Sequence, residues 1–230
     1  MEILLDHGRI IAVNKPHGLL VHRSSIARDA EEFALQMVRD MVGAKVFPVH
    51  RLDRKTSGVL LFARDAEMQS ILNELFQSRG MSKEYLAIVR GYMHDEVLVD
   101  YPLQNERGNA QEAVTQIYPL AHAEIPLPSG HHTTSRYSLV KCVPHTGRMH
   151  QIRRHLAHLR HPILGDRPHG CNKQNRIWKA AYSMETMMLH AYRLRFHLPN
   201  GEPMTIEARP SQEFDRVSNI LGINTLKQHD

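Results

Sequence analysis

The sequence is poor in cysteine and has no long apolar run, low-complexity linker or internal repeat. Its two cysteines, Cys142 and Cys171, stand in neither a metal-binding nor a redox spacing, which is typical of a reducing cytoplasm. No apolar run reaches membrane-spanning length, and the opening residues MEILLDHGRI do not resemble a signal peptide. We therefore expect a cytoplasmic protein with no membrane partner.

Several signatures of cofactor chemistry are also missing. The chain contains no GxxxxGK[ST] phosphate loop, no Rossmann glycine fingerprint and no GxSxG nucleophile elbow. The histidines at 150, 155, 158 and 161 lack the i, i+4 pair of a zinc helix, and no cysteine pair or nearby acid completes a ligand set. These patterns argue against a metal site and against a nucleotide cofactor.

Length and charge set the broad class of protein. The 230 residues suit one domain, which can have two lobes, and are enough to bury a sizeable core. The net charge of +5, before any of the 17 histidines is counted, favours a polyanionic partner, although a modest basic excess is common.

Apolar periodicity predicts hairpins mixed with helices, which is typical of an α+β fold with a mixed sheet. We expect strands at 10–13, 59–63 and 83–89 and a hairpin closed by Asn200-Gly201. The expected helices follow an Asp29/Glu32 capping box and begin near Asp65, Thr146 and Ser211. The polar region from Gln104 to His132 is expected to form loops, as an insertion that contacts substrate.

The run HRLDRKTSGVLLFA, His50 to Ala63, places the carboxylate of Asp53 among Arg51, Arg54 and Lys55. Three nearby cations favour the charged form of a carboxylate. A turn and a buried strand follow, and the end of a strand is where a rigid scaffold commonly presents reactive groups. Asp53 is therefore a candidate catalytic residue; a surface salt-bridge turn is the alternative.

The second motif is HTGRMHQIRRHLAHLRHPILGD, His145 to Asp166. Its expected helix has the apolar stripe Met149, Ile152, Leu156 and Leu159. Arg153 lies at the edge of that stripe and needs a carboxylate, because burying an unpaired charge costs several kcal/mol. We predict that Arg153 pairs with Asp53; the alternatives are that it reaches solvent or pairs with another acid.

Further candidate residues carry positive charge or an aromatic ring. The basic residues Arg148, Arg154 and Arg160 predict a surface that follows the phosphates of a polyanion, and the alternative is an ordinary solvated face. Tyr85 has a ring that can stack on a base and a hydroxyl that can transfer a proton, although a core tyrosine would look the same.

Together the motifs HRLDRKTSGVLLFA, KEYLAIV, TGRMHQIRRHLAHLRHPILGD and MLHAYRLRF resemble the RluA family of pseudouridine synthases, in order and spacing. The likeness runs from NKPHGLLVH to the final hairpin. It is strongest to a tRNA-modifying branch, through RRHLAHLRHPILGD and the HG and QNR that follow. Pro168-His169-Gly170 departs from the Tyr-Gly of many relatives, and the small N-terminal RNA-binding module of some relatives has no counterpart.

The resemblance implies a pseudouridine synthase fold, with a mainly antiparallel mixed sheet around a central catalytic cleft, as a single domain over residues 1–230. It implies isomerisation of uridine to pseudouridine in RNA, without cofactor or metal. Asp53 matches the essential aspartate, Tyr85 the tyrosine that stacks on uracil, and Arg153 the arginine that pairs with the aspartate. Arg51 matches the residue that fills the space of the flipped uridine, and Leu189 lies in the LHA motif that lines the pocket.

The expected substrate is tRNA, with the target uridine at position 65, and the expected state is a monomer. Two alternatives stay open. The same chemistry could act on ribosomal RNA or at another tRNA site, or the chain could be a catalytically inactive RNA-binding protein.

Overall fold

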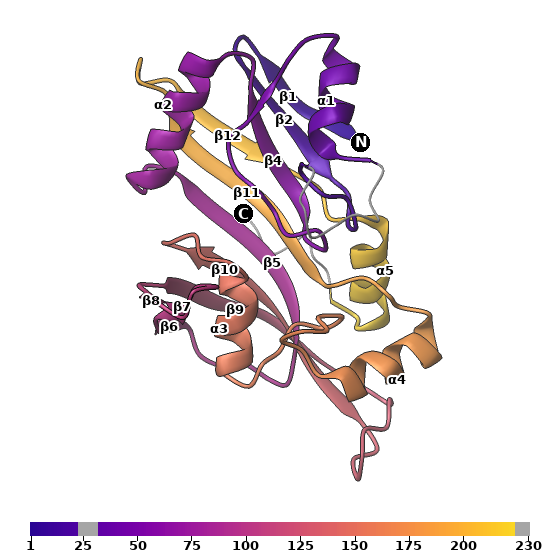
Figure 1. The fold of residues 1–230 in the computed structure, drawn as a ribbon. Helices are drawn as coiled ribbons and strands as arrows, with labels where there is room; N and C mark the ends of the chain where they lie inside the picture. Colours follow the sequence, from indigo (N-terminus) through magenta and orange to yellow (C-terminus); the bar gives the residue numbers. More distant parts are fainter. Residues whose placement is uncertain (23–31, 224–230) are drawn as a thin grey trace. The chain divides into compact units, whose positions relative to one another are not determined.

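The computed structural model describes residues 1–22 and 32–223, which form two compact units. The first unit contains residues 1–83 and 191–210, and the second contains residues 84–190 and the chain from 211 onward. Asp29 of the predicted capping box lies outside the described residues. The α+β class is confirmed, since the described residues contain both helices and strands, and the strands form a mixed sheet (Figure 1). No helix in the described ranges is long and apolar enough to cross a membrane.

Strands of the first unit follow the order β1-β2-β4-β11, with β3 paired to β4 and β12 paired to β11. Their bounds are β1 (Glu2–His7), β2 (Ile10–Lys15), β3 (Phe47–Pro48), β4 (Ser57–Ala63), β11 (Leu189–His197, in this unit from Ala191 on) and β12 (Pro203–Glu207). Every residue of β4 is buried, which confirms the strand expected there. Strand β1 was not expected from the sequence.

Helices α1 (Ala34–Val42) and α2 (Ala66–Gln77) complete the first unit. Asp65 caps α2 as predicted, because its Oδ1 accepts the backbone N–H of Met68 at 2.9 Å. Leu72 on this helix is fully buried in a core that includes Leu61 of β4. The core gives β4 a fixed position, and the Asp53 loop leads directly into that strand.

The strands of the second unit follow the order β5-β10-β9-β6, with a separate hairpin of β7 and β8. Their bounds are β5 (Ser82–Arg90, nearly all in this unit), β6 (Val97–Asp100), β7 (Leu103–Gln104), β8 (Ala110–Gln111), β9 (Val114–Ile125) and β10 (Ser135–Pro144).

The expectation of loops from Gln104 to His132 is wrong for β9, a strand of 12 residues. Pro119 interrupts its sequence pattern, and a proline inside a run argues against a strand. The structure accommodates Pro119 through an irregular register with β10, between Leu139 and Val140.

Three helices belong to the second unit: α3 (Gln151–His158), α4 (Asn172–Tyr182) and α5 (Gln212–Ile220). Ser211 caps α5 as predicted. The predicted Thr146 cap of α3 is wrong, because the Thr146 hydroxyl donates to the Gln151 side chain and the helix begins after His150. The side chain of Met149 therefore falls before the helix and is 51% exposed, not in the core.

Candidate functional site

Asp53 lies in the turn immediately before β4, and its side chain is half-buried. The backbone N–H of Thr56 donates to the carbonyl of Asp53 at 3.0 Å and closes this turn. Leu52 is buried beside it, whereas Arg51 is exposed. The structure thus anchors the loop on an apolar side chain and places the carboxylate at the end of a buried strand.

Lys15 is fully buried at the end of β2 and ties two loops together. Its Nζ donates to the carbonyl oxygens of Pro16 at 2.9 Å, Leu19 at 2.8 Å and Arg54 at 3.3 Å. Burial lowers the pKa of Lys15 to about 7, while the negative charge of Asp53 favours its charged form. Lys15 therefore ties the Asp53 loop to the end of β2. The sequence signal was a lysine that ends an apolar strand before a proline.

Replacing Lys15 with Met is expected to lower the free energy of unfolding by about 2–4 kcal/mol, because three carbonyl groups lose the donor that the buried lysine supplies. Urea denaturation would measure the loss. Lys45 is exposed in the same unit, so Lys45→Met serves as the control. Equal stability of the two variants would contradict the supporting role of Lys15.

His50, the first residue of the Asp53 motif, ties the start of this loop to β4. Its Nε2 accepts the backbone N–H of Leu61 at 3.1 Å, which requires a neutral ring nitrogen. The centroid of the His50 ring lies 4.8 Å from the centroid of the Phe76 ring. Burial lowers the pKa of His50 to about 4, so the folded protein keeps the ring neutral.

We expect His50 to make the protein less stable as the pH falls from 6.5 to about 4. The unfolded chain binds the proton near pH 6.5, whereas the folded protein resists it until about pH 4. Its contribution is fully present above pH 6.5 and changes by up to roughly 3 kcal/mol over this window. Urea unfolding across the window should show a shallower pH slope for His50→Gln, which keeps an acceptor for Leu61. Identical slopes would refute the assignment.

Gly58 explains why the motif requires a glycine after Ser57. A Cβ built there would lie 2.1 Å from the carbonyl oxygen of Ala191, and the backbone has φ of +109°. The LHA motif thus packs its alanine backbone against β4. Two motifs that are far apart in the sequence are neighbours in the first unit for this steric reason.

In the second unit, Arg153 forms a buried bidentate ion pair with Asp166. Arg153 Nε and Nη2 donate to Asp166 Oδ2 and Oδ1, each at 2.8 Å, and the side chains are 5% and 1% exposed. Burial alone would raise the pKa of Asp166, but hydrogen bonds and charge from Arg153 outweigh it and the pKa is lowered.

The structure confirms the expectation that Arg153 needs a carboxylate, and the acid it binds here is Asp166, at the end of the same motif. Pairing of Arg153 with Asp53 stays a prediction, since Asp53 belongs to the first unit.

The backbone around Asp166 is itself held by Asn175 of α4. Asn175 Oδ1 accepts the N–H of Gly165 at 2.9 Å, and its Nδ2 donates to the carbonyl of Asp166 at 2.7 Å. A Cβ at Gly170 would lie 1.9 Å from that carbonyl oxygen, so only glycine fits. The HG and QNR segments that carried part of the resemblance therefore position Asp166.

Strand β5 brings together the segments that carry Tyr85, Asp166 and Leu189. Leu164 donates its N–H to Ile88 at 2.9 Å, and Ile88 donates to Met188 at 3.1 Å. Leu189 follows and is buried, whereas Tyr85 is half-buried on β5 opposite Cys142 of β10. The second unit thus gathers the tyrosine, the arginine segment and the start of the LHA motif around one strand.

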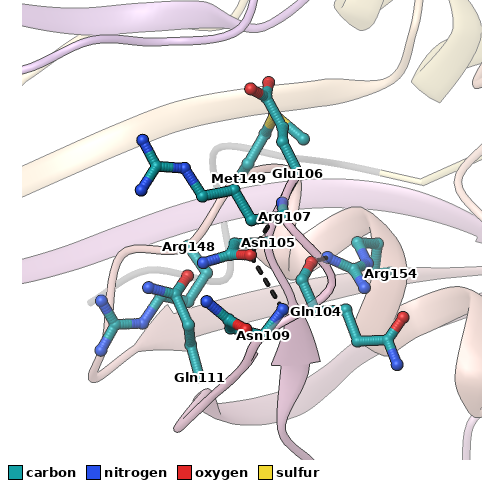
Figure 2. Close-up of a pocket in the computed structure, with 9 residues that line it drawn as sticks. All are labelled: Gln104, Asn105, Glu106, Arg107, Asn109, Gln111, Arg148, Met149 and Arg154. Carbon is teal, nitrogen blue, oxygen red and sulfur yellow. Dashed lines mark hydrogen bonds between the residues drawn. The ribbon is translucent and has the colours of Figure 1, made fainter.

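Two of the three predicted RNA-binding arginines meet at one pocket. Arg148 Nε donates to the carbonyl of Glu112, and Arg154 Nη1 donates to that of Gln104, each at 2.9 Å. Both side chains line a pocket of about 360 Å³ beside the β7–β8 hairpin (Figure 2). Arg160 is not among the residues that line this pocket; it follows the end of α3 with φ of +62° and is exposed.

The basic pocket suits a polyanionic ligand, and the Asp53 carboxylate, presented before a buried strand, is a candidate reacting group. The model for the RNA pseudouridylate synthase family matches residues 9–158. The chain therefore belongs to this family, as the motifs predicted, and is an isomerase that converts uridine to pseudouridine in RNA.

Relatives match over most of the chain. The tRNA pseudouridine synthase C of Vibrio cholerae serotype O1 is 44% identical over 220 residues, 90% of each chain. That of Salmonella typhi is 46% identical over 234 residues, 96% of this chain and 90% of the relative. The solved structure of human RNA pseudouridylate synthase domain containing 4 has a TM-score of 0.74 at 26% identity and covers 97% of this chain and 94% of that chain.

Proposed function

We propose that this enzyme isomerises a uridine of tRNA, the one at position 65, in the cytoplasm and as a monomer. The observation that carries the tRNA assignment is the identity of 42–46% with relatives named tRNA pseudouridine synthase C. Position 65 rests on the motif resemblance. A positive net charge of +5 supports a polyanionic substrate.

In the proposed mechanism Asp53 is the reacting carboxylate. The N1–C1′ bond of uridine breaks and a C5–C1′ bond forms; C5 loses a proton and N1 gains one. Asp53 drives this either by covalent attack or by proton abstraction, and no cofactor or metal takes part. The half-buried position of Asp53 on a loop fixed by Lys15 and His50 supports this role, because a fixed carboxylate needs little reorganisation.

Other residues bind and orient the substrate. A base in a stem must first leave its stack, at a cost of a few kcal/mol, and phosphate contacts from Arg148, Arg154 and Arg160 offset that cost. We propose that Arg51 fills the space that the target uridine leaves when it flips out of the RNA. Tyr85 stacks on the uracil ring and transfers a proton. Arg153 pairs with Asp53 in this proposal, and Leu189 lines the uridine pocket.

The test is to incubate the purified protein with unmodified tRNA and ribosomal RNA transcripts, and to map pseudouridine by carbodiimide-dependent reverse-transcription stops. A stop at position 65 in the T-stem is the expected result. Stops in ribosomal RNA alone would keep the chemistry and overturn the substrate. Tight binding with no stop on any transcript would favour an inactive RNA-binding protein.

A further inference from the structure

The pocket is built entirely from the second unit, by the β7–β8 hairpin, the turn that precedes α3 and Arg154 of α3 itself (Figure 2). Asp53, Tyr85 and Arg153 are not among its lining residues. It is therefore separate from the set of residues assigned to the target uridine. The lining residues are Gln104, Asn105, Glu106, Arg107, Asn109, Gln111, Arg148, Met149 and Arg154.

The hairpin loop is ordered by its own hydrogen bonds before any ligand binds. Asn105 Oδ1 accepts the backbone N–H of Arg107 at 2.9 Å and of Asn109 at 3.0 Å, the bonds drawn in Figure 2. Gly108 donates its N–H to the Asn105 carbonyl at 3.0 Å and has φ of +80°, which favours glycine. A loop that is already ordered loses little conformational entropy on binding.

Positive charge dominates the pocket, with three arginines and one acid, Glu106. Arg148 donates one hydrogen bond to the backbone next to the hairpin, and Arg154 donates one to the backbone within it. These bonds restrain the two guanidinium groups. Arg107 is exposed at the loop tip. A planar guanidinium matches a phosphate with two parallel hydrogen bonds, so this arrangement suits an RNA phosphate.

The remaining lining residues suit the base of a nucleotide. Side-chain amides of Gln104, Asn109 and Gln111 can donate to and accept from base edges, and Met149 is 51% exposed and offers an apolar contact. A volume of about 360 Å³ lies near the small end of ligand pockets, roughly 300–1,000 Å³. Most lining residues are exposed, which suits a segment of a polymer better than an enclosed free ligand.

We propose that this pocket binds one nucleotide of the RNA substrate other than the target uridine, with its phosphate on the arginines and its base against the amides. The inference rests on the proposed function, since the polymer is the RNA substrate. Binding at a second nucleotide adds affinity and selects RNA shape without touching the reacting atoms. The pocket therefore governs KM and leaves kcat unchanged.

Two variants test the site with a full-length tRNA transcript. Arg107→Ala is expected to raise KM about tenfold with kcat within about twofold, and to reduce the salt dependence of binding by about one phosphate contact. Asn105→Asp keeps the oxygen that orders the loop but adds negative charge, so KM should also rise while the thermal midpoint stays unchanged. Arg136→Ala, which removes an exposed arginine of β10 in this unit, is the control.

Unchanged KM and salt dependence in Arg107→Ala would overturn the site, and so would an equal change in Arg136→Ala. A fall in kcat without a change in KM would also overturn it. Failure of the wild-type protein to form pseudouridine on any transcript would instead overturn the proposed function. The two failures are therefore distinguishable in one set of assays.

Discussion

Asp53→Asn should reduce pseudouridine formation by a factor of about 10⁴ or more, while the Kd for the tRNA transcript changes little. The amide cannot attack carbon or accept a proton as the carboxylate does, but it keeps nearly the same shape in the turn before β4. Single-turnover mapping of pseudouridine would measure the loss, and filter binding would measure the Kd.

Asp40→Asn is the matched control, because Asp40 is an exposed acid of the same unit that pairs with Arg39. Its turnover should equal that of the wild-type protein. Comparable turnover by Asp53→Asn would refute the catalytic assignment. If Asp53→Asn lost both RNA binding and turnover, Asp53 would have a role in binding the RNA as well as in the reaction.

Arg153→Ala should lower the free energy of unfolding by about 3–5 kcal/mol and also abolish turnover. The large cost arises because the substitution leaves the Asp166 carboxylate, 1% exposed, without its bidentate partner. Urea unfolding would measure the change. By contrast, Arg136→Ala removes an exposed partner of Glu124 and should cost less than about 1 kcal/mol.

The double variant Arg153→Met with Asp166→Leu separates stability from catalysis. It removes both buried charges together, so much of the stability should return. Turnover should stay absent, because the proposed partner of Asp53 is still missing. Recovery of turnover with stability would assign Arg153 a purely structural role. Wild-type stability of Arg153→Ala would refute the importance of the buried pair.

The family and several local elements were predictable from the sequence, because their signals lie within a few residues. The Asp65 and Ser211 caps, the buried β4 strand and the final hairpin depend on local periodicity and capping chemistry. The demand of Arg153 for a carboxylate also followed from its place on a helix.

Other features depend on contacts between distant segments. Pro119 argues against a strand in the sequence, so β9 was not predicted. The pairing of β9 with β10 has an irregular register at this point, and this irregularity accommodates the proline. The start of α3 was misplaced because Thr146 binds Gln151 and Val114 instead of capping the helix.

The sequence by itself determined the family, the reaction class and the residues to which the chemistry is assigned, because a motif keeps its residue types in a readable order. Only the tertiary structure decided that Asp166 is the carboxylate held by Arg153, that Lys15 and His50 fix the Asp53 loop, and that Arg148 and Arg154 share a pocket with the β7–β8 hairpin. The physical reason is that a buried charge or hydrogen-bonding group takes whichever partner the folded chain brings within reach, and sequence separation does not specify that partner.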